Sequence, residues 1–320
     1  MKIVVLDGHA LNPGDLDWGP MQRLGELQVY PRTPEDQVVE RAQGADAVFT
    51  NKTKLRPEAL AQLPQVRYIG VLATGYDCVD IATAREQKIV VTNIPTYGTS
   101  TVAQFACALM LELCHHVGRH ERAVNAGEWT TNPDWTFWKT PQIELAGKTL
   151  GIAGFGRIGR QMGEIGNALG MRVLAHDIAA YRVNPPAWQG FRFVEIDELL
   201  RAADVVSLHC PLTPETRGMI NATSLKQMKP TAFLVNSSRG PLIVEPDLAD
   251  ALNQGRLAGA ALDVLSTEPP PADNPLLTAK HCIITPHMAW STRAARGNLM
   301  NTAVNNLTAF LAGKPVNVVS

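Results

Sequence analysis

The stretch that decides the fold is KTLGIAGFGRIG, Lys148 to Gly159. Its first part, Thr149 to Ala153, is a short apolar run typical of a buried strand, and Arg160 to Leu169 can continue as a helix. Between them, GFGRIG matches the pattern G-x-G-x-x-G, with the three glycines at Gly154, Gly156 and Gly159. A strand, a tight turn and a helix in this order predict a site where a pyrophosphate meets a helix N-terminus.

A carboxylate follows the next predicted strand. The run Val173 to Asp177 ends in an acid 18 residues beyond Gly159. At that distance a carboxylate accepts hydrogen bonds from the ribose of an adenosine and repels a 2′-phosphate. A glycine-rich loop without a ligand is the alternative for the glycine pattern alone. With the strand, the helix and the acid together, the sequence predicts a dinucleotide site that prefers NAD to NADP.

The composition is that of a globular protein without a case for nucleic acid or membrane as partner. A length of 320 residues suggests two domains, and 45% hydrophobic residues suffice for two cores. The net charge of −1 offers no attraction to polyanions. No apolar run is long enough to span a bilayer, and the N-terminal sequence turns polar after Leu6, unlike a secretory signal. We therefore expect a cytoplasmic protein.

The cysteines and a histidine pair suggest no metal. Five cysteines without C-x-x-C spacing are expected to be buried, reduced thiols. His116 and His120 have the i, i+4 spacing of metal ligands on a helix, but no third ligand is evident. We predict a solvated or interface position for this pair, and no metal site.

Short apolar runs alternate with helix-compatible segments along the whole chain, which predicts an α/β protein with two doubly wound parallel sheets. The first sheet would use the runs Ile3 to Leu6, Asp46 to Asn51, Val66 to Leu72 and Lys88 to Asn93. The second would use Thr149 to Ala153, Val173 to Asp177, Phe191 to Val194, Asp204 to Cys210, Thr231 to Asn236, Gly259 to Val264 and Cys282 to Thr285.

The second sheet is expected to be a Rossmann domain inserted in a flavodoxin-like domain. The helix predicted over Ser291 to Ala312 is assigned back to the first domain, because chain termini often lie close together. The predicted domains are 1–98 with 290–320, and 99–289, with a hinge where the chain crosses between them. The second would bind NAD.

Two further segments flank the domain boundary. A long helix is expected to begin with a capping box of Thr101 and Gln104 and to run into His115 to Gly118. The following stretch, Asn125 to Gln142, is rich in aromatic residues that need cover, namely Trp129, Trp135, Phe137 and Trp138. We predict an arm that packs against a partner subunit, with a loop folded on its own protein as the alternative.

Three residues that follow late strands have the chemistry of a reductase. Arg239 in LVNSSRG offers a planar fork for a carboxylate. His287 in ITPHMAWS could protonate a carbonyl oxygen while hydride reaches the carbon, and Glu268 in LDVLSTEPP could stabilise its imidazolium form. Singly, each could be a surface or structural residue. The loop Ala73 to Asp77 could offer N–H groups to an anion, or could be a simple turn.

These motifs in their order resemble the D-isomer-specific 2-hydroxyacid dehydrogenases. The resemblance covers almost the whole chain, through GFGRIG, HCPLTPETRGMI, LVNSSRG, LDVLSTEPP and TPHMAW, with VLATGYDCVD and NIPTYGTSTVAQFACALMLEL before them. It implies an NAD domain within a split substrate domain, a homodimer, and a small 2-keto or 2-hydroxy acid as substrate. It also implies that His287 is the proton donor, Glu268 its partner and Arg239 the group that binds the substrate carboxylate.

The resemblance further implies the remaining binding residues. Ala73, Thr74 and Gly75 would bind the substrate carboxylate through backbone N–H groups, although the family usually has glycine where Ala73 stands. Cofactor contacts would fall on the fingerprint and on loops after several strands, namely Gly154, Gly156, Arg157, Ile158, Gly159, Asp177, His209, Cys210, Pro211, Thr216, Ser237, Ser238, Arg239, Asp263 and His287.

Within the family, the stretch NPDWTFWKTPQIELAGKTLGIAGFG looks most like glycerate dehydrogenases, also called hydroxypyruvate reductases. This resemblance implies that Trp135 or Trp138 reaches the active site of the partner subunit. Glu268 argues against formate, because formate dehydrogenases of this fold carry a glutamine there. Reduction of hydroxypyruvate or glyoxylate is the main hypothesis, and lactate, a branched 2-keto acid or phosphite are alternative substrates. An NAD-sensing binding protein, such as the corepressors that resemble this family, is a further alternative, but those carry extensions that we do not expect here.

Overall fold

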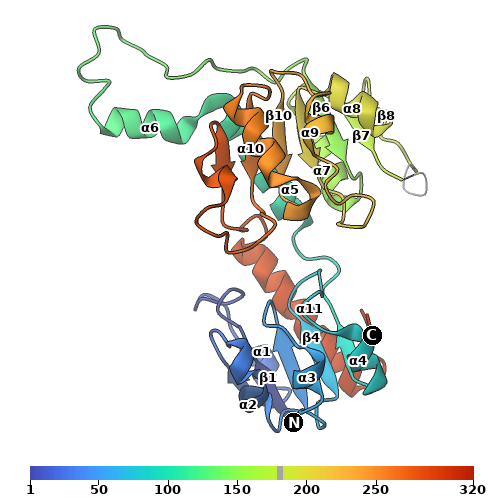
Figure 1. Ribbon diagram of the computed structural model, residues 1–320. Helices are drawn as coiled ribbons and strands as arrows, with labels where there is room; N and C mark the ends of the chain where they lie inside the picture. Colours follow the sequence, from blue (N-terminus) through green and yellow to red (C-terminus); the bar gives the residue numbers. More distant parts are fainter. Residues whose placement is uncertain (179–182) are drawn as a thin grey trace. The chain divides into compact units, whose positions relative to one another are not determined.

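The computed structural model describes residues 1–178 and 183–320, and it forms two compact units. The first unit comprises Met1–Gly98 and Trp290–Ser320, and the second comprises Thr99–Ala289 (Figure 1). Each unit has its own sheet, in which every paired strand is parallel, so the α/β class with two parallel sheets is confirmed.

The sheet of the first unit has five strands in the order β2-β1-β3-β4-β5, which is the flavodoxin-like order. Side chains alternate between its two faces: Ile3 and Val5 join one core cluster, whereas Val4 and Leu6 join the other. The strands are β1 (Lys2–Val5), β2 (Glu26–Val29), β3 (Ala47–Thr50), β4 (Tyr68–Val71) and β5 (Val90–Thr92). The helices are α1 (Gly19–Gln22), η1 (Glu35–Gln37), α2 (Val38–Ala42), α3 (Pro57–Leu60), α4 (Ile81–Glu86) and α11 (Arg293–Leu311).

The sheet of the second unit has seven strands in the order β12-β11-β10-β9-β6-β7-β8, the Rossmann order with one added edge strand. Both faces are covered by apolar clusters. The strands are β6 (Thr149–Ala153), β7 (Arg172–His176), β8 (Arg192–Phe193), β9 (Val205–Leu208), β10 (Phe233–Asn236), β11 (Gly259–Leu262) and β12 (Cys282–Ile284). The helices are α5 (Thr99–His115), α6 (Val117–Asn125), α7 (Arg157–Ala168), α8 (Ile196–Ala202), α9 (Ala222–Leu225), η3 (Gly240–Leu242), α10 (Glu245–Asn253) and η4 (Pro275–Thr278).

The C-terminal helix α11 packs on the sheet of the first unit. Leu299, Met300, Ala303 and Leu307 lie in the same core cluster as Ile3 and Phe49. The chain therefore completes the first core only after the whole second unit, which makes this core depend on contacts between residues far apart in sequence.

Two expectations about single elements are wrong, and one strand was not predicted. The helix α5 begins at Thr99, so Thr101 lies within its first turn and does not cap it. The helix also ends at His115, because His116 has a φ of +48° and a new helix begins at Val117. The edge strand β2 was not expected, because its side chains alternate between exposed and half-buried and form no apolar run.

The cysteines are free, and two of them are buried. Cys114 and Cys210 have the expected burial, whereas Cys78, Cys107 and Cys282 are only partly buried. Among the described residues, no helix combines the length and the apolar character needed to cross a bilayer.

Candidate active site

The glycine fingerprint forms the turn between β6 and α7. Gly154 has a φ of +94°, and a Cβ on it would lie 2.4 Å from the backbone nitrogen of Cys210. A Cβ on Gly159 would lie 2.0 Å from the carbonyl oxygen of Gly154. A Cβ on Gly156 would meet no atom within 4 Å. The first and third glycines are thus required by packing, and the second faces open space at the start of α7, where a pyrophosphate fits.

Asp177 is held beside this turn by two backbone groups. Its Oδ2 accepts a hydrogen bond from the Phe155 N–H at 2.6 Å, and its Oδ1 accepts one from the Ile178 N–H at 2.8 Å. The side chain is half-buried. A negative charge is therefore fixed at the fingerprint, in the place that a ribose hydroxyl pair requires and a 2′-phosphate avoids.

The loop after β9 packs against the fingerprint turn, where Cys210 lies close to Gly154. Burial lowers the pKa of His209 to about 4 and raises the pKa of the Cys210 thiol to about 11, so both groups are neutral at pH 7. The Thr216 hydroxyl donates to the carbonyl of Pro211 at 2.7 Å, which closes the following turn. The loop after β9 therefore presents uncharged side chains, which suit the uncharged parts of a dinucleotide.

The loop after β10 is hydrogen-bonded to the loop after β9. The Ser238 hydroxyl donates to the carbonyl of Cys210 at 2.6 Å. The hydroxyl oxygen of Ser237 is buried and has no hydrogen-bond partner among the residues that the structure describes. A buried polar atom without a partner is costly. Ser237 is thus a suitable contact for a bound cofactor.

Arg239 is presented by a rigid backbone. The amide of the buried Asn236 donates to the Arg239 carbonyl at 2.9 Å and accepts from the Ser238 N–H at 3.0 Å. A Cβ on Gly240 would lie 1.9 Å from the carbonyl carbon of Leu265, so the loops after β10 and β11 touch at a point that only glycine allows. The Arg239 side chain itself is exposed, with Nη1 donating to the Ser238 carbonyl at 2.8 Å.

Glu268 and His287 are hydrogen-bonded to each other at the same sheet edge. Nδ1 of His287 lies 2.6 Å from Oε2 of Glu268, and the side chains are 31% and 35% exposed. The other carboxylate oxygen of Glu268 accepts from the Leu265 N–H at 3.0 Å. Because Glu268 takes Nδ1, Nε2 is the imidazole nitrogen that can serve as an acid toward a substrate.

Asp263 holds the loop that carries His287. This residue is only 1% exposed. Its Oδ1 accepts from the Thr285 hydroxyl at 2.6 Å and from the Met288 N–H at 2.9 Å, and its Oδ2 accepts from the Ala289 N–H at 2.8 Å. The resemblance implies that Asp263 is a cofactor contact, whereas the contacts that the structure shows for its carboxylate are to the histidine loop.

The loop Ala73–Gly75 belongs to the first unit, where it follows β4. The carbonyls of Ala73 and Thr74 accept from the Ile94 N–H at 3.0 Å and from the Asn93 amide at 2.7 Å. Within the described part of this unit, the N–H groups of Thr74 and Gly75 have no hydrogen-bond partner. Two donors are thus available for an anion.

Sequence reasoning missed several polar residues that hold the loops of the first unit. Asp7 follows β1 and accepts from three backbone N–H groups, at residues 51–53, at 2.6–2.7 Å. Asn51 follows β3 and donates to the Leu72 carbonyl at 2.8 Å, and Asn93 follows β5. The signal that could have found them is a polar residue directly after a buried parallel strand.

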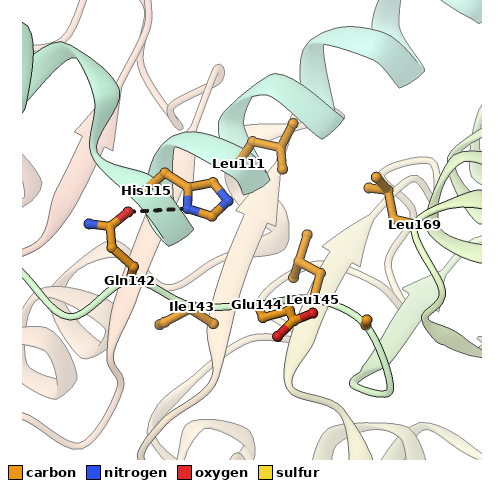
Figure 2. Close-up of a pocket in the computed structure, with 8 residues that line it drawn as sticks. Leu111, His115, Gln142, Ile143, Glu144, Leu145 and Leu169 are labelled. Carbon is orange, nitrogen blue, oxygen red and sulfur yellow. Dashed lines mark hydrogen bonds between the residues drawn. The ribbon is translucent and has the colours of Figure 1, made fainter.

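The remaining candidates lie elsewhere on the second unit. Nδ1 of His120 pairs with the carbonyl of His116 at 2.9 Å, and the described residues include no cluster of three potential metal ligands. A shallow pocket lies between α5 and the segment before β6, and Figure 2 shows His115 turned toward Gln142, at 3.3 Å from Nδ1 to Oε1. Its lining is mostly apolar and comprises Leu111, His115, Gln142, Ile143, Glu144, Leu145, Ala146 and Leu169.

A dinucleotide fingerprint, an arginine and a histidine paired with a glutamate, all after strands of one Rossmann sheet, are the parts of a nicotinamide-dependent dehydrogenase. Residues 107–289 match the family model described as D-isomer specific 2-hydroxyacid dehydrogenase, NAD binding domain. The chain belongs to this family, which confirms the resemblance and NAD as the cofactor of its second unit.

Individual relatives cover the whole chain. The hydroxypyruvate reductase of Blautia hydrogenotrophica is 56% identical over 323 residues, which is 100% of both chains. The glycerate dehydrogenase of Methylorubrum extorquens is 40% identical over 320 residues, which is 99% of this chain and 98% of that one. Among solved structures, the NAD-complexed D-isomer specific 2-hydroxyacid dehydrogenase of Lactobacillus delbrueckii ssp. bulgaricus matches 100% of both chains with a TM-score of 0.80 and 26% identity.

Proposed function

We propose that this protein is an NAD-dependent dehydrogenase that reduces a small 2-keto acid, hydroxypyruvate or glyoxylate, to the D-2-hydroxy acid. The observation that carries the proposal is the contact of 2.6 Å between His287 and Glu268 at the carboxyl edge of a Rossmann sheet. The names of the relatives, a hydroxypyruvate reductase and a glycerate dehydrogenase, support the choice of acid.

Each site residue has one role in this reaction. Bound NADH supplies the hydride that the carbonyl carbon receives. His287 donates the proton to the keto oxygen, and Glu268 stabilises and orients the imidazolium through Nδ1. Arg239 binds the substrate carboxylate and polarises the carbonyl, because a guanidinium forks onto planar acids. In the first unit, the N–H groups of the Ala73–Gly75 loop serve as donors to a substrate carboxylate, and the second unit serves NAD.

The assay that tests this function uses purified protein, NADH and a panel of 2-keto acids. Hydroxypyruvate, glyoxylate, pyruvate and a branched 2-keto acid are compared by kcat/KM, and NAD with phosphite is included as a separate reaction. We expect the highest kcat/KM with hydroxypyruvate or glyoxylate, and a D product by chiral chromatography. No oxidation of NADH with any acid would overturn the proposal.

The protein acts as a homodimer in this proposal. The side chains of Trp129, Trp135 and Trp138 are 51%, 87% and 67% exposed, and Figure 1 shows α6 and the following segment reaching away from the rest of their unit. Aromatic surface of this extent is typical of an interface. One tryptophan of the arm, Trp135 or Trp138, then contacts the substrate of the partner subunit. We place the enzyme in the cytoplasm, in keeping with its five free cysteines.

A further inference from the structure

A chain of asparagine side chains leads from the C-terminal segment of the first unit to the loop Ala73–Gly75. We infer that Asn93, Asn306 and Asn317 are positioning residues that aim the N–H groups of this loop at the substrate carboxylate. The inference rests on the proposed function, because it assumes that the loop binds the acid. It makes the C-terminal segment a part of the substrate site, although no residue of that segment carries chemistry.

The orientation of the loop follows from where its carbonyls bind. The Asn93 amide donates to the Thr74 carbonyl at 2.7 Å, and the Ile94 N–H donates to the Ala73 carbonyl at 3.0 Å. In a planar trans peptide, C=O and N–H point in opposite directions. Fixing these two carbonyls on residues 93–94 therefore turns the N–H groups of Thr74 and Gly75 to the other side. Both N–H groups lack a partner within the described part of their unit, as this orientation requires.

The Thr74 side chain adds a third attachment. Its hydroxyl donates to the Ile94 carbonyl at 2.8 Å. The loop is thus tied to residues 93–94 by three hydrogen bonds, and a shift of Asn93 would move the whole loop.

Asn93 is in turn fixed from two other segments. The Asn306 amide of α11, at 1% exposure, donates to the Asn93 carbonyl at 2.9 Å, and the Asn93 N–H donates to the Asn317 carbonyl at 3.1 Å. The Asn317 amide closes the arrangement by donating to Oδ1 of Asn306 at 2.8 Å. Asn93 therefore has little freedom, since its backbone N–H, its backbone carbonyl and its side-chain amide N–H each take part in a hydrogen bond of this network.

The C-terminal segment is held in place independently of these amides. Val318 forms an antiparallel bridge with Thr92, and the Val319 N–H donates to the Val91 carbonyl at 2.9 Å. Asn317 has a φ of +54°, a conformation that asparagine and glycine tolerate better than other residues. Replacing Asn317 by glycine therefore removes the amide without straining the backbone.

The test compares wild type with Asn93→Ala and Asn317→Gly, and with Asn305→Ala as a matched control. Asn305 lies on α11 beside Asn306, but its side chain is exposed. The measurements are kcat, KM for hydroxypyruvate, and Kd for NADH from its fluorescence, with the melting temperature as a check of folding. We expect KM to rise roughly tenfold in Asn93→Ala, about the effect of one lost hydrogen bond, and severalfold in Asn317→Gly. Kd for NADH and the control variant should stay at wild-type values.

The outcomes separate the inference from the proposed function. Wild-type protein that reduces no 2-keto acid would refute the function, and the inference with it. Active wild type with an unchanged KM in both variants would refute the inference alone. A purely structural role would lower the melting temperature or change KM and the Kd for NADH together, and would also overturn it.

Discussion

His287 owes its suitability as an acid to one neighbour. Glu268 binds Nδ1 at 2.6 Å and is itself held by the Leu265 N–H, so the carboxylate cannot easily turn away from the ring. A carboxylate in this position fixes which imidazole nitrogen can deliver the proton. In the proposed reaction, Glu268 therefore orients the imidazole of His287.

Arg239 allows a test of the fork geometry. In Arg239→Lys an ammonium replaces the planar guanidinium, so one of the two hydrogen bonds to the substrate carboxylate is lost. A charge-assisted hydrogen bond contributes about 1.5–3 kcal/mol, so we expect kcat/KM to fall roughly 10- to 150-fold, with a higher KM. Steady-state kinetics at saturating NADH measure this, and a variant with wild-type kcat/KM would show that Arg239 does not grip the acid.

Asp177 allows a test of cofactor choice. The Asp177→Ala variant removes the charge that repels a 2′-phosphate, and we expect the preference for NADH over NADPH, as a ratio of kcat/KM values, to fall at least about tenfold. Since Asp177 also binds the N–H groups of Phe155 and Ile178, the loop itself could loosen. A loosened loop would impair both cofactors equally, so an unchanged ratio would contradict the ribose role.

At the scale of single residues, the sequence predicted the reactive side chains better than the residues that hold them in place. Arg239, Glu268 and His287 could be proposed because each has a reactive side chain after a strand. The hydrogen bonds that Asp263 accepts from the loop of His287 could not be predicted. They form only because Thr285, Met288 and Ala289 fold back onto β11. The sequence alone does not show which backbone groups a buried aspartate will bind.

At the scale of elements, the ends of parallel strands position almost every candidate residue. The fingerprint follows β6, Asp177 follows β7, the loop Ala73–Gly75 follows β4, and the loops after β9, β10, β11 and β12 carry the rest. The predicted and the observed strand coincide at β6. The apolar runs overestimate most other strands by one to three residues, because buried apolar residues continue into the loops. The break at His116 was not predicted, because nothing in its neighbours indicates a positive φ at a non-glycine residue.

The contact of helix α11 with the loop at Asp15 predicts a pH effect on stability. Two hydrogen bonds from the Arg296 guanidinium, at 2.7 Å each, hold the pKa of Asp15 below its usual value. A lowered folded pKa stabilises the fold above the unfolded value of about 3.9, and this contribution disappears as the pH falls through the folded pKa. We expect Asp15→Asn to melt at lower temperature than wild type at pH 7, with the gap closing below about pH 4.

Differential scanning fluorimetry from pH 7 to pH 3 measures this gap. Asp36→Asn, at an exposed aspartate of the same unit, serves as the control and should show no such closing gap. A gap between Asp15→Asn and wild type that stays constant down to pH 3 would contradict the role of the ion pair.

At the scale of the whole molecule, the first unit is assembled from both ends of the chain. Periodic apolar runs made its sheet predictable. The hydrogen bonds among the asparagines were not predictable, because Asn306 and Asn93 are 213 residues apart in sequence. Only the return of α11 to the first sheet brings them together. Contacts of this kind follow from topology and not from any local pattern.

The exposed arm predicts the oligomeric state. Trp135→Ala together with Trp138→Ala should raise the dimer dissociation constant by at least about 30-fold, because buried tryptophans commonly contribute 2 kcal/mol or more to an interface. Sedimentation velocity over a range of concentrations measures this, with Leu277→Ala, an exposed apolar residue outside the arm, as the control. A wild-type protein that remains monomeric at every concentration would refute the dimer.

The central claim is that His287 protonates the keto oxygen while most contacts to NAD are made by other residues. The most direct measurement compares His287→Ala with wild type for turnover of hydroxypyruvate and for NADH binding by fluorescence titration. Loss of a general acid costs about 10²- to 10⁴-fold in kcat, and we predict a loss of this size with a nearly unchanged Kd for NADH. Loss of NADH binding, or turnover close to that of wild type, would contradict the account.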